Sequence, residues 1–404
     1  MVLCWFGLFL TGCNKAVETG NKDEKAQLYI QVNMVGNTLS TKANDEIIED
    51  PLLPNEKLHT LRIVIVRPDG EVEHNRYINL NDGGTSEFEG LEKTGYEAFK
   101  VAPNEVKRVY LFANEETYAG TETGKFDFSA YPAGSTDFES AVKNFELTGE
   151  VDGSKPLPQS SVYNLLVPGG VASSATNPIK KELTVVRAMT KFTFTFESSR
   201  PMKVTVDELE VGSVADKSYL LPHFYKDDGT KIDNSADYEI SEKFWVNWLK
   251  ETADKSHIVS QSDKLDFISN YNIPDRTSHA VLAKTGLDMD ITTTISDTLV
   301  FYAHESKYIP AGASGQKYVI NKLKIRDNNE SSTNPTVMTF DASGSFKEAL
   351  ELVKVKSLFR NTHVMVRVIF TPGDLAIYAR IMPWNDWVTE GTTPPYDKLI
   401  EIVD

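Results

Sequence analysis

The stretch Lys191-Phe192-Thr193-Phe194-Thr195-Phe196 decides the fold class. Its aromatic side chains occupy every second position and alternate with threonine and lysine. Successive side chains of a β-strand point to opposite faces of the sheet, so this period of two predicts a strand with one apolar and one polar face. The run Val364–Phe370 repeats the pattern, with apolar residues again at every second position.

Working outward, the same alternation occurs at Leu28–Val35, and nearly continuous apolar runs occur at Leu61–Val66 and Val109–Ala113. Helical patterns are few, and the best is Ser345–Lys356, where a serine and a glutamate three residues later have capping-box spacing. Short strands bounded by Gly, Pro, Asn and Asp are typical of β-sandwiches. The sequence therefore predicts an all-β fold built from sandwich domains.

The chain has 404 residues, which at roughly 150 residues per domain indicates two or three domains. Breakers and small residues gather between Pro156 and Lys181. We therefore expect a boundary near residue 182, with an N-terminal β-sandwich domain over residues 13–182 and a C-terminal one over 183–404. Three long polar segments, 81–95, 117–136 and 227–237, are expected to be surface loops.

Charge and motif spacing exclude several classes of function. The net charge is −16 and the pI is about 5.0, so a basic surface for nucleic acid is not expected. The seven histidines are scattered without a zinc-binding spacing. Ser314 lacks the spacing of a nucleophile elbow, and His304 and Glu305 are neighbours on a predicted strand, where they point to opposite faces. We therefore predict no enzyme activity, no metal and no cofactor.

The first thirteen residues contain both cysteines of the chain, Cys4 and Cys13. Residues 1–12 are uncharged and mostly apolar but shorter than the roughly 20 residues that span a bilayer. They fit a signal peptide, and Leu10-Thr11-Gly12-Cys13 is similar to a bacterial lipobox, in which the cysteine is lipidated after cleavage. We predict that residues 1–12 are removed and that Cys13 carries the lipid. Because no Lys or Arg precedes the apolar run, we expect the true start of translation to lie upstream.

Taken in their order along the chain, several segments resemble the fimbrillin family, the FimA-type and Mfa-like pilus subunits of anaerobic oral and gut bacteria. The resemblance implies two transthyretin-like β-sandwich domains in tandem, a lipid-anchored place at the cell outer membrane or in a fimbrium, and a role in cell adhesion. It also implies partners, namely other fimbrial subunits and a ligand on a host or bacterial surface. The segments are Leu10–Cys13, Leu28–Val35, Ser40–Asn44, Leu61–Val66, Lys107–Asn114, Val186–Phe192, Leu299–Glu305, Phe359–Val364 and Trp384–Trp387.

The resemblance further implies assembly by donor-strand exchange, in which the first strand is lost and a strand from a neighbour fills the vacated groove. The expected protease cut falls between Lys42 and Ala43, and the expected donor strand contains Leu399, Ile400, Ile402 and Val403.

Two readings of these segments remain open, because Lys42 could be an ordinary loop lysine and Tyr396–Asp404 could be the last edge strand of its own domain. The alternative function is that of a non-polymerising surface lipoprotein that binds glycan or another ligand through its loops.

Overall fold

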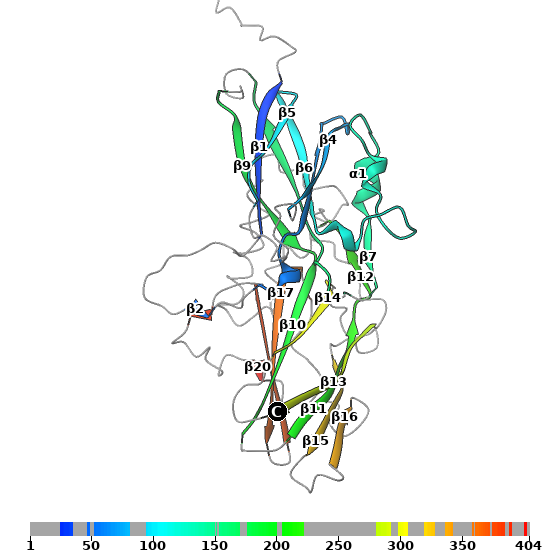
Figure 1. Cartoon of the computed structure of the whole chain (residues 1–404), viewed down its shortest axis with the longest axis vertical. Helices are drawn as coiled ribbons and strands as arrows, with labels where there is room; N and C mark the ends of the chain where they lie inside the picture. The colour runs from blue at the N-terminus through cyan, green and yellow to red at the C-terminus, as the bar shows by residue number, and fades with distance from the viewer. Residues whose placement is uncertain are drawn as a thin grey trace, which may run out of the picture.

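The all-β prediction is confirmed, since strands make up most of the described chain. Figure 1 shows an elongated molecule with a seven-stranded sheet at one end and a five-stranded and a four-stranded sheet at the other. None of the described helices has the length and apolar character needed to cross a membrane. The computed structural model describes residues 25–34, 47–48, 52–80, 94–149, 151, 153–169, 176–199, 204–221, 280–291, 298–305, 319–327, 336–341, 358, 360–371, 374–383, 388–389 and 400–401.

The seven-stranded sheet folds over onto itself to make a sandwich. Strands β8 and β9 pair only at Gln159↔Arg187 and Ser160↔Val186, so the strands on either side of this corner diverge and enclose a common core. Strand β1 pairs parallel with β9 and antiparallel with β5. The sheet order is β4 (Val72–Asn79), β3 (Thr60–Val66), β6 (Glu105–Ala113), β8 (Gln159–Val167), β9 (Ile179–Arg187), β1 (Ala26–Met34) and β5 (Glu97–Val101).

Strands β3 and β6 are buried on both faces, which explains their nearly continuous apolar runs. One face, for example Ile63 and Ile65, packs in the sandwich core, and the other, for example Val64, packs under an aromatic layer. Phe126 and Phe128 belong to that layer and are only 5% and 2% exposed. The expectation that 117–136 is a surface loop is therefore wrong for its aromatic residues, because their burial outweighs the polar character of the segment.

The five-stranded and four-stranded sheets share a second core and form a sandwich at the other end of the molecule. Phe192, Phe194 and Phe196 all lie in this core and are fully buried, as their alternation predicts. The five-stranded sheet has the order β14 (Leu299–His304), β10 (Met189–Ser198), β17 (Thr362–Thr371), β18 (Asp374–Pro383) and β20 (Ile400–Glu401), and the four-stranded sheet has the order β13 (Ala280–Ile291), β11 (Val204–Val214), β15 (Val319–Asp327) and β16 (Thr336–Asp341).

The chain leaves the seven-stranded sheet at Ala188, between β9 and β10. Residue 182, where the boundary is expected, falls inside β9, and the breaker-rich segment Pro156–Lys181 contains the whole of β8. Two short ladders join distant parts of the chain, namely β7 with β12 and β2 with β19. The remaining elements are β2 (Ile47–Ile48), η1 (Pro54–Glu56), η2 (Glu115–Thr117), η3 (Phe128–Ala130), α1 (Phe138–Lys143), β7 (Glu146–Thr148), β12 (Lys217–Tyr219) and β19 (Val388–Thr389).

Candidate functional site

We call the seven-stranded sheet with the segments packed on it the N-terminal half, and the five-stranded and four-stranded sheets the C-terminal half. Strand β1 contributes one complete apolar face to the core of the N-terminal half. Ala26, Leu28, Ile30, Val32 and Met34 are each at most 2% exposed. Burial of a large apolar side chain contributes about 1.5–3 kcal/mol, so the four larger residues together contribute on the order of 10 kcal/mol. That is comparable with the roughly 5–15 kcal/mol by which a whole domain is stable. The N-terminal half therefore needs a strand in this position.

The backbone of β1 is paired on both sides. Strand β9 follows it from Leu28↔Ile179 to Met34↔Val185, and β5 follows it as far as Ile30↔Glu97. Beyond that point Thr94 replaces β5, since the Val32 N–H donates to Thr94 Oγ1 at 2.9 Å and the Thr94 N–H donates to the Val32 carbonyl at 2.9 Å. Loss of β1 would thus leave two facing rows of unpaired backbone groups.

An ionic cluster holds the beginning of β1. Lys25 Nζ lies 3.2 Å from Glu73 Oε1, whose carboxylate also accepts hydrogen bonds from Lys107 Nζ at 2.5 Å and from the Ala102 N–H at 2.7 Å. Burial raises the pKa of Glu73, but the hydrogen bond and the charge of Lys107 outweigh it and leave this pKa below its ordinary value. Glu73 is therefore ionised and attracts a cation to the residue that precedes the strand.

The outer edge of β5 is closed by side chains that reach across from β4. His74 Nε2 donates to the Lys100 carbonyl at 2.8 Å, and Arg76 Nη1 donates to the Ala98 carbonyl at 3.1 Å. The guanidinium of Arg76 also lies 4.4 Å from the centre of the Phe99 ring. The side chains that donate to these two carbonyls occupy the space along the edge where an added strand would pair, so this edge is protected.

The outer edge of β4 is covered by the segment that carries the aromatic layer. The Val72 N–H donates to the Ser135 carbonyl and the Gly134 N–H donates to the Val72 carbonyl, both at 2.8 Å. The side-chain amide of Asn75 donates to the carbonyls of Phe128 and Tyr131. Both described edges of this sheet are thus obstructed at these residues, whereas the position of β1 is bordered by strands on both sides.

Buried charges join the two halves. Lys191 Nζ on β10 lies 2.9 Å from Glu56 Oε1 in η1, and both side chains are at most 1% exposed. The Tyr302 hydroxyl donates to the same Glu56 oxygen at 2.8 Å. Burial and the Glu56 charge raise the pKa of Tyr302. These groups form a polar core between the halves rather than an accessible site.

A second buried ion pair lies in the same region. Arg360 Nη2 is 2.5 Å from Glu305 Oε1 and donates to the Tyr219 carbonyl at 2.7 Å, with both charged side chains at most 1% exposed. Nearby, His363 Nε2 is 2.8 Å from Thr193 Oγ1. Burial lowers the pKa of His363, and the positive charge of Lys191 lowers it further.

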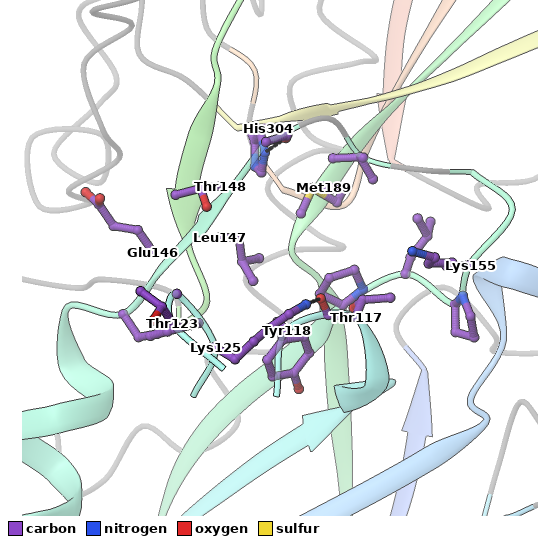
Figure 2. Close-up of a pocket in the computed structure, with 17 residues that line it drawn as sticks. Thr117, Tyr118, Thr123, Lys125, Glu146, Leu147, Thr148, Lys155, Met189 and His304 are labelled. Atoms are coloured by element: carbon purple, nitrogen blue, oxygen red, sulfur yellow. Dashed lines mark hydrogen bonds between the residues drawn. The ribbon is translucent and has the colours of Figure 1, made fainter. Parts of the chain in front are cut away.

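A pocket of about 290 Å³ lies beside this junction, lined by the segment 117–125, by β7 and by His304 (Figure 2). His304 Nε2 lies 2.8 Å from the Gly149 carbonyl, which can only accept a hydrogen bond, so Nε2 carries the proton and donates it. His304 Nδ1 then accepts a hydrogen bond from Ser218 Oγ at 2.8 Å. Burial lowers the pKa of His304. Its imidazole is thus neutral with both nitrogens engaged, and its neighbour Glu305 binds Arg360 instead. Among the described residues no cluster of three His, Cys, Asp or Glu side chains could hold a metal ion.

Most of the predicted site residues lie outside the described part of the chain, namely Cys13, Lys42, Ala43, Leu399, Ile402 and Val403. Ile400 lies in β20, which pairs with β18 through Ala379↔Ile400.

Sequence reasoning missed Glu73, Thr94 and the caps on β5. One usable signal was Lys107, which shares the inward face of β6 with Val109 and is itself fully buried. A lysine at such a position requires a buried carboxylate partner.

Comparisons with known proteins place the chain near several solved structures. No family model and no curated protein matches the sequence. A candidate cell adhesion protein from Parabacteroides distasonis is 14% identical with a TM-score of 0.46, over 89% of this chain and 98% of that one. The tip fimbrial protein Mfa3 from Porphyromonas gingivalis is 12% identical with a TM-score of 0.45, over 89% and 100%. A fimbrial assembly protein from P. distasonis is 9% identical with a TM-score of 0.39, over 91% and 99%.

The caps on β5 predict the behaviour of an edge variant. Replacing both His74 and Arg76 with alanine frees the Lys100 and Ala98 carbonyls, and we expect the chain to self-associate through β5. Sedimentation velocity over a range of concentrations checks this. A matched control, Lys100→Ala with Lys180→Ala, removes two basic side chains but leaves the caps in place and should stay monomeric. A capless variant as monomeric as the control would contradict the role assigned to the two caps.

The buried histidines predict a pH-dependent stability. Because the pKa of His304 and of His363 is lower in the folded chain than in the unfolded one, the unfolded chain binds more protons below its histidine pKa of about 6.5. Stability is therefore full above pH 6.5 and falls as the pH drops toward the folded pKa values, by up to about 1.4 kcal/mol per pH unit for each histidine. Urea unfolding at pH 7.5 and 5.5 measures the fall. It should be smaller in His363→Gln, and an unchanged fall in that variant would rule out its contribution.

Proposed function

We propose that this protein is a fimbrial subunit of the fimbrillin type, exported as a lipoprotein and assembled by donor-strand exchange to act in cell adhesion. Under this proposal Cys13 carries the lipid that holds the subunit at the cell outer membrane. The two sandwich domains follow in tandem, and we place their boundary at Ala188, where the chain changes sheets, rather than at residue 182.

The observation that carries the proposal is the position of β1. It is an interior strand whose five inward residues are at most 2% exposed, and in the sequence it precedes the segment that contains Lys42. A cut after Lys42 would turn β1 from a part of the chain into a separate strand. Backbone ladders on both sides and a row of apolar pockets are the features by which added strands are recognised.

The covered edges of β4 and β5 favour replacement of β1 over addition of a strand at an edge. Strand addition at β4 or β5 is opposed by the segment 128–135 and by the caps from His74 and Arg76. Replacement of β1 avoids both obstacles because it uses a position that is already built to hold a strand. The donor strand that this subunit would offer to the groove of a neighbouring subunit is the segment that contains Leu399, Ile400, Ile402 and Val403.

A second candidate function rests on the pocket beside the junction. Thr123, Thr148 and Lys155 line it together with Phe145, a mixture of polar and aromatic groups that could receive a sugar. A surface lipoprotein that binds glycan without polymerising would use this pocket and would keep β1 in place.

Limited trypsin digestion separates the two candidates. We expect cleavage after Lys42 and release of the fragment that contains β1, whereas a glycan-binding protein that keeps β1 in place would retain this fragment. The variant Lys42→Ala is the matched control and should not release it. A fragment that stays bound after the cut would contradict strand exchange, and release from Lys42→Ala would show that the cut lies elsewhere.

The lipid anchor has its own test. Cells that express the chain should incorporate a fatty-acid analogue at Cys13, because covalent lipidation of a lipobox cysteine anchors the mature protein. The variant Cys13→Ala should lose the label and appear in the soluble fraction, whereas Cys4→Ala should behave as the unchanged chain. Persistent labelling of Cys13→Ala would refute the assignment.

A further inference from the structure

The groove under β1 specifies the strand that can fill it. Its occupant must present a small residue and then four larger apolar residues at alternate positions, as Ala26, Leu28, Ile30, Val32 and Met34 do. Because these positions are fully enclosed, a charged side chain at any of them would be buried without a partner, which is strongly unfavourable.

Two polar contacts add to this specification. The carboxylate of Glu73 favours a cation just before the first apolar position, where Lys25 lies at 3.2 Å. The side-chain amide of Gln31 donates to the Thr94 carbonyl at 2.5 Å. The groove thus selects a strand that has apolar residues at alternate positions and a basic residue directly before the first of them.

Residues 396–404, Tyr-Asp-Lys-Leu-Ile-Glu-Ile-Val-Asp, do not meet this specification. In one register the inward residues include Lys398 and Asp404, and in the other they include Asp397 and Glu401. A slip of one residue exchanges the two faces but leaves a charge at an inward position in each case. If Lys398 is placed opposite Glu73, the inward position of Leu28 receives Glu401.

We propose that the strand that replaces β1 belongs to a different protein and not to a second copy of this chain. This inference rests on the proposed function. The partner strand carries a basic residue, a small residue and four larger apolar residues at alternate positions. Residues 396–404 can then act only toward a different groove, so this subunit would join two unlike neighbours or end an assembly.

Strand exchange into the full chain tests the inference. A recognition sequence for a site-specific protease replaces Ser40–Asn44, the chain is cut, and fluorescent peptides are added. The peptides carry residues 25–34, residues 396–404, and residues 396–404 with Lys398→Leu and Asp404→Leu, which restores an apolar inward face. We expect the 396–404 peptide to bind at least about 100-fold more weakly than the 25–34 peptide, and the substituted peptide to regain at least about tenfold. The uncut chain should bind none of them.

The contribution of the ion pair between Lys25 and Glu73 is measured separately. The variant Glu73→Gln should weaken binding of the 25–34 peptide by about two- to fivefold, because the pair with Lys25 is partly exposed. It should leave a Lys25→Ala peptide unaffected.

The outcomes distinguish the two levels of the proposal. If the 396–404 peptide binds the cut chain as tightly as the 25–34 peptide, the inference is overturned while strand exchange stands. If no peptide enters the cut chain, strand exchange itself fails and the inference fails with it.

Discussion

The arrangement of the two halves depends on one carboxylate, that of Glu56. In a fully buried setting it meets the ammonium of Lys191 and the hydroxyl of Tyr302, while the Leu53 N–H lies 3.3 Å from its second oxygen. Such a pair is costly to bury, and breaking it by removing one partner costs about 3–5 kcal/mol. Because η1 belongs to one half and β10 and β14 to the other, only one placement of the halves satisfies all these groups at once.

This junction and the groove of β1 are held by different residues. The contacts that join the halves include those of Glu56 in η1 with β10 and β14, the ladder of β7 with β12, and the hydrogen bond of Arg187, the last residue of β9, to Asn361, and β1 supplies none of these. The groove is held by β9, β5, Thr94 and Glu73. A change in the strand that fills the groove can therefore leave the junction intact. Because different residues hold the junction and the groove, the first strand can be exchanged without a change in how the two halves are arranged.

Sequence patterning revealed the strands but not how the chain uses both of their faces. The alternation Phe192–Phe196 was sufficient because only one face of β10 is aromatic. Runs such as Leu61–Val66 did not show which side chains point to which face of the sheet, because both faces of β3 are buried against different layers. Charged residues in strands, such as Lys107 and Lys191, were uninterpretable without their partners, which lie 34 residues and more than a hundred residues away in the chain. The boundary near residue 182 stays a prediction, and that residue falls within β9 because the breakers on which it was based also surround β8, an interior strand.

Replacing β1 by a strand of similar sequence changes the free energy little, because the same contacts are lost and regained. Whether exchange occurs therefore depends on whether β1 is still covalently attached to the chain. While β1 is attached to the chain its effective concentration at the groove is very high, of the order of millimolar or above for short linkers. A cut in the segment after β1 removes this advantage and makes the departing strand compete on equal terms with any other. The better fit then decides, and fit is defined by the inward face of the groove and by Glu73. Under the proposed function the covered edges of β4 and β5 keep the chain from associating before that cut, which confines assembly to the interior position.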